Sequence, residues 1–78
     1  MLDRVLAHLV GGIVEHPDEV SVTAVEGNRG ETLESRVHPD DLGRVIGRGG
    51  RTAKALRTVI GALSRGKRVR VDVVDPES

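Results

Sequence analysis

The residues of this sequence whose types and spacing best suit a chemical task form a short run, Gly47-Arg48-Gly49-Gly50-Arg51. Glycine permits positive φ angles, and it carries no side chain that would keep a phosphate away from the backbone. Arginine carries a planar fork of hydrogen-bond donors that matches phosphate oxygens. The run therefore predicts a tight backbone turn that binds phosphate. The alternative is a plain linker between two helices, with arginines that serve only solubility.

The segments on both sides of this run have the pattern of helices. Pro39, Asp40 and Asp41 suit a first helical turn, because proline is pre-shaped for it and acids favour the positive end of the helix dipole. Residues 52–64 carry apolar residues at helical spacing. Those that we expect on the buried face are Ala53, Leu56, Val59, Ile60 and Leu63. Because this second helix begins near Gly50, its free N–H groups also favour an anion there.

The rest of the chain predicts one more helix and three strands. Residues 2–13 repeat apolar residues at the spacing of one helix face. Residues 18–27 and 31–39 alternate apolar and polar residues on either side of a Gly-Asn-Arg-Gly turn, which is typical of an antiparallel hairpin. Residues 67–75 alternate in the same way. The two helices before them make a crossover long enough for this last strand to lie parallel to a hairpin strand.

This order, α-β-β-α-α-β, predicts a two-layer α+β fold. We expect a three-stranded mixed sheet with one face covered by the helices. The chain is too short for a second domain. Its core must be aliphatic, since the sequence contains no Phe, Tyr or Trp. That absence also excludes the aromatic platforms on which many single-strand binders stack bases.

The charges are unevenly distributed, although the formal net charge is zero. Residues 1–41 hold nine acids and three bases, whereas residues 42–71 hold nine bases and no acid. A segment of this kind makes a local positive field, which favours a polyanion such as a nucleic acid. A solvated helix face is the alternative, although such faces usually carry both signs.

Other functions lack the residues that they need. The sequence has no cysteine, and His8, His16 and His38 do not have metal-ligand spacing. We therefore expect surface or capping histidines, and no bound metal or cofactor. Neither a phosphate-binding loop of the P-loop type nor a dinucleotide-binding motif is present, and no catalytic constellation can be inferred, so we expect no enzyme activity. No apolar run is long enough to cross a membrane, and we expect a cytoplasmic protein.

The glycine run and the element order together resemble a type II KH domain. More narrowly, the sequence is similar to the small single-domain bacterial KH proteins of the KhpA family. Residues 1–75 would be the single KH domain, and residues 76–78 a C-terminal tail. The most specific part is VIGRGGRTAKALRTVI, residues 45–60, in which a G-x-x-G loop with basic residues lies between two amphipathic helices.

The resemblance implies an RNA-binding module whose loop clamps about four unpaired nucleotides. The bases would lie in an aliphatic groove between the helices and a strand edge. The implied RNA-binding residues are Ile46, Gly47, Arg48, Gly49, Gly50, Arg51, Lys54 and Arg57. Of these, Lys54 and Arg57 either touch phosphates or face water. We expect the floor of the groove to include Leu42, Val45, Ile46, Thr52, Ala53 and Leu56. Either a longer basic track or a solvent-facing strand would account for Arg65, Lys67, Arg68 and Arg70.

The resemblance also implies partners and a role. Besides single-stranded RNA, the implied partners are a second copy of the chain, as a homodimer, and a larger KH-containing RNA-binding protein, as a heterodimer. The implied role is that of a post-transcriptional regulator or RNA chaperone with low sequence specificity. A different function for the same fold is a protein–protein assembly module, which would use the KH fold mainly for homo- or hetero-dimerisation.

Overall fold

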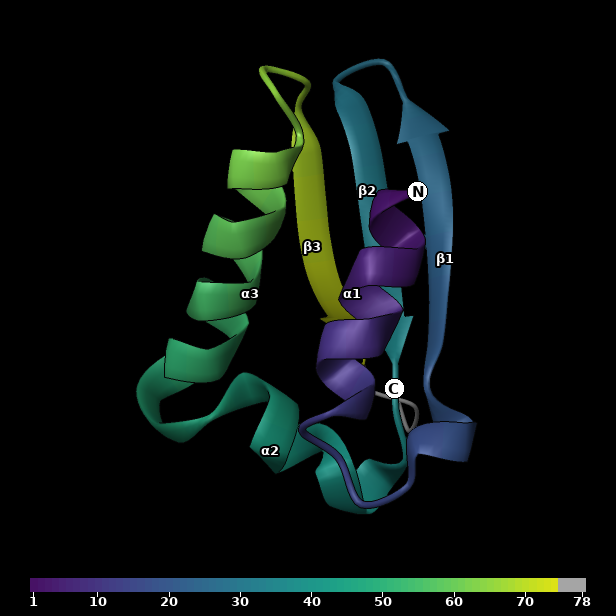
Figure 1. The fold of residues 1–78 in the computed structure, drawn as a ribbon, viewed down its shortest axis with the longest axis vertical. Coiled ribbons are helices and arrows are strands. Elements are labelled where there is room, and N and C mark those ends of the chain that lie inside the picture. Colours follow the sequence, from purple (N-terminus) through teal and green to yellow (C-terminus); the bar gives the residue numbers. More distant parts are fainter. Residues whose placement is uncertain (75–78) are drawn as a thin grey trace.

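The elements of the fold follow the predicted order, as the computed structural model, which describes residues 1–74, shows (Figure 1). The helices are α1 (Leu2–Gly11), α2 (Leu42–Ile46) and α3 (Arg51–Leu63). The strands are β1 (Ser21–Gly27), β2 (Gly30–Arg36) and β3 (Val69–Val74). Between them lie the 3₁₀ turns η1 (Pro17–Glu19), η2 (Pro39–Asp41) and η3 (Arg48–Gly50). The predicted tail, residues 76–78, lies outside the described residues.

The three strands form one mixed sheet, as predicted, and their spatial order is β1-β2-β3. Strands β1 and β2 are antiparallel, and Gly27 pairs with Gly30 at their turn. Strand β3 runs parallel to β2, with Val71 opposite Leu33. Helices α1 and α3 lie side by side on one face of the sheet (Figure 1), with α1 against β1 and α3 against β3. The fold is therefore the two-layer α+β arrangement of a type II KH domain.

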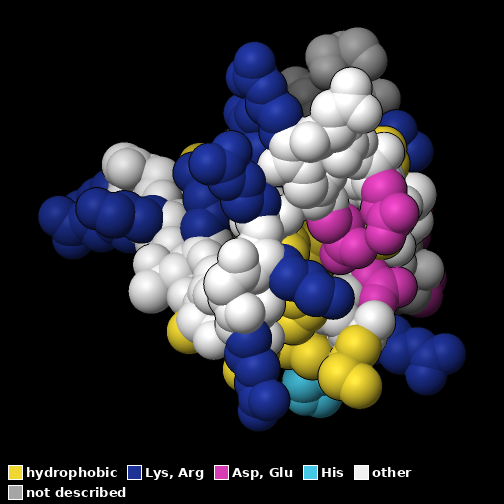
Figure 2. All heavy atoms as spheres, turned by 90° about the horizontal axis from the view of Figure 1, so that it is seen from above, with side chains coloured by type: hydrophobic (Ala, Val, Ile, Leu, Met, Phe, Trp, Pro, Cys, Tyr) yellow, Lys and Arg dark blue, Asp and Glu magenta, His cyan; other side chains and the backbone are white. Residues whose placement is uncertain are grey.

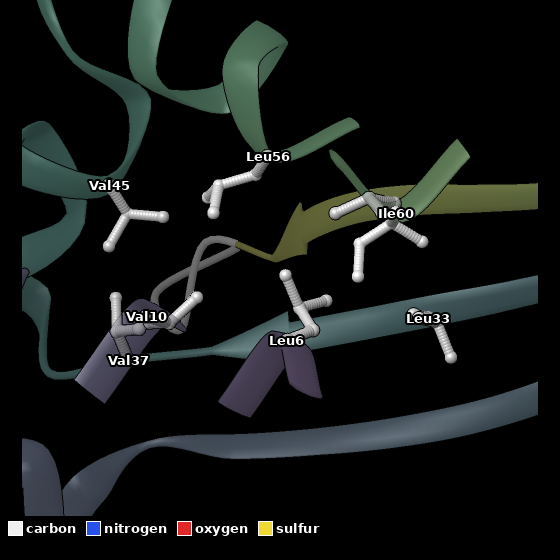
Figure 3. Packing of buried hydrophobic residues seen from close by; sticks show 8 residues of the cluster. Leu6, Val10, Leu33, Val37, Val45, Leu56 and Ile60 are labelled. Carbon is white, nitrogen blue, oxygen red and sulfur yellow. The ribbon is translucent and has the colours of Figure 1, made fainter. Parts of the chain in front are cut away.

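The core between the two layers is aliphatic, as the composition requires. It is built from buried side chains of all three helices, of β2 and its extension, and of β3 (Figure 3). These are Leu6, Val10, Leu33, Val37, Val45, Leu56, Ile60 and Val71. Val45 is the buried residue of α2. This side chain therefore anchors the five-residue helix that leads into the glycine run.

Two residues of the predicted buried face of α3 lie at the surface instead. The side chains of Val59 and Leu63 are 43% and 49% exposed, whereas Ala53, Leu56 and Ile60 are buried as predicted. Val59 borders a groove between α1 and α3, and Leu63 borders a hollow near the N-terminus. The prediction was wrong for these two because periodicity locates an apolar stripe on a helix, but not how much of it a narrow sheet covers.

A buried carboxylate ties the connection between α1 and β1 to the start of α2. Asp41 is 1% exposed, and it accepts hydrogen bonds from the backbone N–H groups of Glu15 (3.1 Å) and His16 (3.0 Å). The Nδ1 of the His16 ring donates a third bond, at 3.0 Å. A buried carboxylate needs such donors, because its desolvation is otherwise unfavourable. The sequence predicted Asp41 only as an acid for the helix dipole, whereas its bonds fix where α2 begins.

These contacts lower the pKa of Asp41 and raise the pKa of His16. Burial alone would raise the pKa of Asp41, but its bonds from Glu15 and His16 hold that pKa below its ordinary value of 3.8. The hydrogen bond to Asp41 raises the pKa of His16 above its ordinary value of 6.5, against the opposing effect of burial. The Asp41 contribution to stability is therefore lost as the pH falls through its lowered pKa. The His16 contribution is complete below pH 6.5 and is lost as the pH rises through the raised pKa.

We expect the unsubstituted chain to lose stability as the pH rises above 6.5, and a His16→Gln variant to lose less over the same range. The reason is that the His16 ring binds its proton more tightly in the folded chain than in the unfolded chain. Thermal unfolding followed by circular dichroism across this range measures the difference, and His8→Gln, at an exposed position of α1, is the matched control. Parallel pH profiles for the unsubstituted chain and His16→Gln would show that the pair does not form.

Candidate nucleic-acid interface

The glycine run forms a turn that only glycine adopts readily. Helix α2 ends at Ile46 and α3 begins at Arg51. Between them, Gly47, Gly49 and Gly50 have φ angles of 75°, 64° and 77°. Residues with a side chain are strained in this left-handed region. The predicted interruption between two helix ends is confirmed.

Two of these glycines leave the backbone bare toward solvent. Within residues 1–74, a Cβ atom at Gly49 or Gly50 would meet no atom within 4 Å apart from its chain neighbours. At Gly47, by contrast, a Cβ atom would lie 2.8 Å from the Cβ of Thr52 and 2.9 Å from its backbone nitrogen. Gly47 thus allows the chain to pass close to the first turn of α3. Gly49 and Gly50 then present open backbone at the start of that helix.

Cationic side chains surround this bare backbone. Arg48, Arg51 and Lys54 are exposed, and within residues 1–74 none of them forms an ion pair. Arg44, by contrast, pairs with Glu15 at 2.9 Å. The cations of the loop are therefore available to phosphate oxygens, which the guanidinium fork of arginine matches well.

An open groove begins beside the loop and separates the helices from strand β3. Its volume is about 580 Å³. Its walls are formed by Ile46, Gly50, Ala53 and Arg57 on the helical side, and by Asp72, Val73 and Val74 on the strand side. The side chain of Ile46 is 39% exposed. This apolar side chain offers the groove a surface suited to the flat face of a base.

The strand side of the groove is the open edge of the sheet. The Arg68 carbonyl accepts a hydrogen bond from the Glu31 N–H of β2, at 2.9 Å. Successive residues of a strand direct their N–H and C=O groups to alternate sides. Since Arg68 faces β2, Val71 and Val73 direct their N–H and C=O groups away from β2. The Val71 carbonyl accepts a hydrogen bond from Arg57 Nε, at 3.2 Å. Val73 therefore directs its N–H and C=O toward the groove that it lines.

The structure places all the predicted site residues except Lys54 at the loop or along this groove. Ile46 and residues 47–51 lie at the turn itself. Arg57 lines the groove, where its bond to Val71 holds the side chain against the strand. Lys54 is exposed one turn beyond the loop and does not line the groove, so any contact with RNA would be to a phosphate outside it.

Of the residues predicted for the floor of the groove, Ile46 and Ala53 line the groove that the structure shows. Val45 is fully buried, and Leu42 packs against the core. Thr52 and Leu56 line the groove between α1 and α3 instead. The sequence missed Val73 and Val74, because alternation predicted the strand but not which end of it faces α3.

His16 and His38 make structural contacts, whereas His8 is exposed on α1. Within residues 1–74, no cluster of His, Asp and Glu has the arrangement of a metal site. The rings of His16 and His38 stack with their centroids 4.0 Å apart, and His38 Nδ1 accepts a hydrogen bond from the Asp40 N–H at 3.1 Å. The capping role is confirmed for His38. None of the helices in the described part of the chain is long and apolar enough to span a membrane.

Comparison with known protein families shows which family this sequence matches. A model of the KhpA/KhpB KH domain matches residues 3–74. The chain belongs to this family. The match includes the whole glycine run and all three strands, so the KhpA/KhpB domain coincides with the fold that the structure describes.

Individual members of the KhpA/KhpB family are closely similar along almost their whole length. The RNA-binding protein KhpA of Leifsonia xyli subsp. xyli is 67% identical over 75 residues, which are 96% of this chain and 99% of that protein. The RNA-binding protein KhpA of Streptomyces coelicolor is 63% identical over 75 residues, or 96% and 94% of the two chains. A more distant relative of the same name, from Halalkalibacterium halodurans, is 44% identical over 95% of this chain and 100% of its own.

Proposed function

We propose that this chain binds short segments of single-stranded RNA through the Gly47–Gly50 loop and the groove beside it, without catalysing a reaction. The observation that carries the proposal is the bare backbone at Gly49 and Gly50. It lies between an open groove and cations that form no ion pair within residues 1–74. The relatives from Leifsonia and Streptomyces, which are named RNA-binding proteins, support the same conclusion.

The phosphates of the RNA bind at the loop. Gly49 and Gly50 allow a phosphate to approach the backbone at the start of α3, where the positive end of the helix dipole favours an anion. Arg48 and Arg51 add charged donors on either side. Lys54, one turn further, contributes charge at longer range. These groups read the sugar–phosphate backbone and not the sequence of bases.

The bases lie in the groove. Ile46, Ala53 and Val73 supply apolar surface for their flat faces, in a chain without aromatic residues. The N–H and C=O of Val73 offer one donor and one acceptor to a base edge. Every RNA base presents a donor and an acceptor on its Watson–Crick edge, so a backbone contact of this kind discriminates weakly. Low sequence specificity follows, as a regulator or chaperone of many RNAs requires.

Assembly compensates for the small size of one binding site. A contact with about four nucleotides buries little surface, so a single copy has modest affinity. A homodimer binds two segments of one RNA and gains affinity through effective concentration. We include in the proposal two assemblies, a homodimer and a heterodimer with a larger KH-containing RNA-binding protein. Both assemblies are placed in the cytoplasm.

The salt dependence of RNA binding tests this function. For a random-sequence single-stranded RNA pentamer, the logarithm of affinity is expected to fall with the logarithm of salt concentration at a slope of about −2, as about three phosphate contacts require. Fluorescence anisotropy at several salt concentrations measures the slope, with a blunt RNA duplex as the control ligand. A slope near zero, or equal affinity for the duplex, would contradict binding of an unpaired backbone at the loop.

An assembly module is the second candidate function, and one observation favours it. The exposed apolar side chains of Val59 and Leu63, together with the groove between α1 and α3, form a surface suited to a partner protein. The two functions predict opposite results for a chain with a damaged loop. An assembly module still binds its partner protein when the loop is damaged. It does not bind RNA even when the loop is intact, so the damage changes no RNA affinity.

A further inference from the structure

A second groove lies at the other end of the seam between α3 and β3. The first groove borders Gly50 and Ala53 at the start of α3, whereas the second borders Gly61 and Ser64 near its end. The second groove has a volume of about 680 Å³. We call it the turn groove, because the β1–β2 turn and the α3–β3 turn form its rim. Helix α3 has 13 residues, so roughly 20 Å separates the loop at its start from the turn at its end.

Four cations line the turn groove; Arg70 pairs with Asp72 at 3.2 Å, whereas the other three have no carboxylate partner within residues 1–74. Arg29 comes from the β1–β2 turn, and Lys67 and Arg68 come from the α3–β3 turn. All three are exposed, and in the described part of the chain none of them forms an ion pair. One carboxylate, Glu31, also lines the groove, which leaves its lining positive. Figure 2 looks onto this end of the molecule, where Lys and Arg side chains project outward and the acids gather on one side.

Glycines keep the turn groove open. In the described part of the chain, a Cβ atom at Gly61 or Gly66 would meet no atom within 4 Å apart from its chain neighbours and, at Gly61, the backbone of its own helix. Glycine inside a helix is less stable than alanine, and neither close packing nor a positive φ requires it at Gly61. At the turn, Arg65 has a φ of 51°, which is uncommon for a residue with a side chain. The space above Gly61 is therefore available to a ligand, beside a turn that carries a further cation.

We propose that the turn groove binds the phosphate backbone of the same single-stranded RNA that the loop holds. This inference rests on the proposed function, because the loop must first hold the strand. The two grooves share α3 and β3 as walls, and Arg57 lies on the seam between them. Even at the duplex spacing of about 3.4 Å per phosphate, about six further nucleotides cover the distance. A strand of about twelve nucleotides therefore reaches both grooves, whereas a pentamer with about four nucleotides held at the loop has only one nucleotide left.

Two variants of the full chain test this site by different means. Arg29→Gln with Lys67→Gln removes two cations of the groove, and Gly61→Leu fills its space without changing charge. Arg4→Gln with Arg36→Gln removes the same charge from exposed positions elsewhere and is the matched control. Affinities for random-sequence single-stranded RNAs of five and twelve nucleotides are measured by fluorescence anisotropy over a range of salt, and circular dichroism melting verifies that each variant is folded.

Both turn-groove variants are expected to bind the pentamer as the unsubstituted chain does and to bind the dodecamer about tenfold more weakly near 0.1 M salt. For the charge variant, the salt slope with the dodecamer falls by about 1.4, since two phosphate contacts are lost. Unchanged dodecamer binding in the two variants would overturn the inference. So would an equal loss with the pentamer, because the turn groove would then belong to the loop site. Failure of the unsubstituted chain to bind either RNA would instead overturn the proposed function.

Discussion

Replacing Arg48 and Gly49 with aspartate is expected to lower the affinity for single-stranded RNA by at least about 100-fold, while the domain stays folded. The double substitution removes one cation and places two carboxylates where a phosphate would bind. The fold tolerates it because the space around Gly49 is open. Its φ of 64° is also one that aspartate adopts more readily than most residues. Fluorescence anisotropy with an RNA pentamer measures the loss, and circular dichroism melting reports on the fold.

A matched control separates this local effect from a general change of charge. Arg4→Asp with Gly12→Asp makes the same two exchanges at exposed positions of α1 and its C-cap. We expect this control to keep most of the RNA affinity. If the loop variant binds RNA as well as the unsubstituted chain, then the loop is not the binding site, and the assembly module becomes the better function.

Gly47→Ala is expected to destabilise the domain by about 2–4 kcal/mol, which lowers the melting temperature by more than about 10 °C in a chain of this size. The backbone at Gly47 has φ 75° and ψ 170°, a combination that is essentially confined to glycine. The new Cβ atom would also lie too close to Thr52, since the backbone nitrogen of Thr52 would be only 2.9 Å from it. Shortening the Thr52 side chain would not relieve that contact.

Two other glycines calibrate this effect. Gly50→Ala has a comparable φ, 77°, but open space around the new methyl group, so its cost should be only about 1–2 kcal/mol. Gly43→Ala lies within α2 with no atom near the new Cβ, and we expect it to leave stability unchanged or slightly higher. Thermal melting of the three variants measures the order. Equal losses for Gly47→Ala and Gly50→Ala would mean that the approach to Thr52 does not constrain the loop.

The loop could be predicted from the sequence because its determinants are local. Glycines between two periodic apolar patterns define where helices end, and the positive φ angles at Gly47, Gly49 and Gly50 follow from that requirement. The directions of the strands were predictable for a similar reason, although the strand that pairs with β3 was not. A short hairpin turn forces antiparallel pairing, and a long helical crossover permits a parallel strand.

The remainder depends on contacts between distant segments. The groove residues Val73 and Val74 depend on the position of α3 beside the sheet edge, which no local pattern encodes. The side chain of Asp41 is buried because residues 15 and 16 approach it from another part of the chain. The bond from Arg57 to Val71 likewise depends on how α3 packs against β3. Sequence patterns located these elements but could not assign these contacts.

The most direct measurement of the central claim is a nuclear magnetic resonance titration of the ¹⁵N-labelled chain with a random-sequence single-stranded RNA pentamer. The amide signals of Gly47, Gly49, Gly50 and Val73 are expected to shift most, because phosphates bind at the loop and base edges meet the open edge of β3. The amide signals of β1, which is the strand at the opposite edge of the sheet from β3, should not shift. Shifts confined to α1 and β1, with Gly49 and Gly50 unmoved, would contradict RNA binding at the loop.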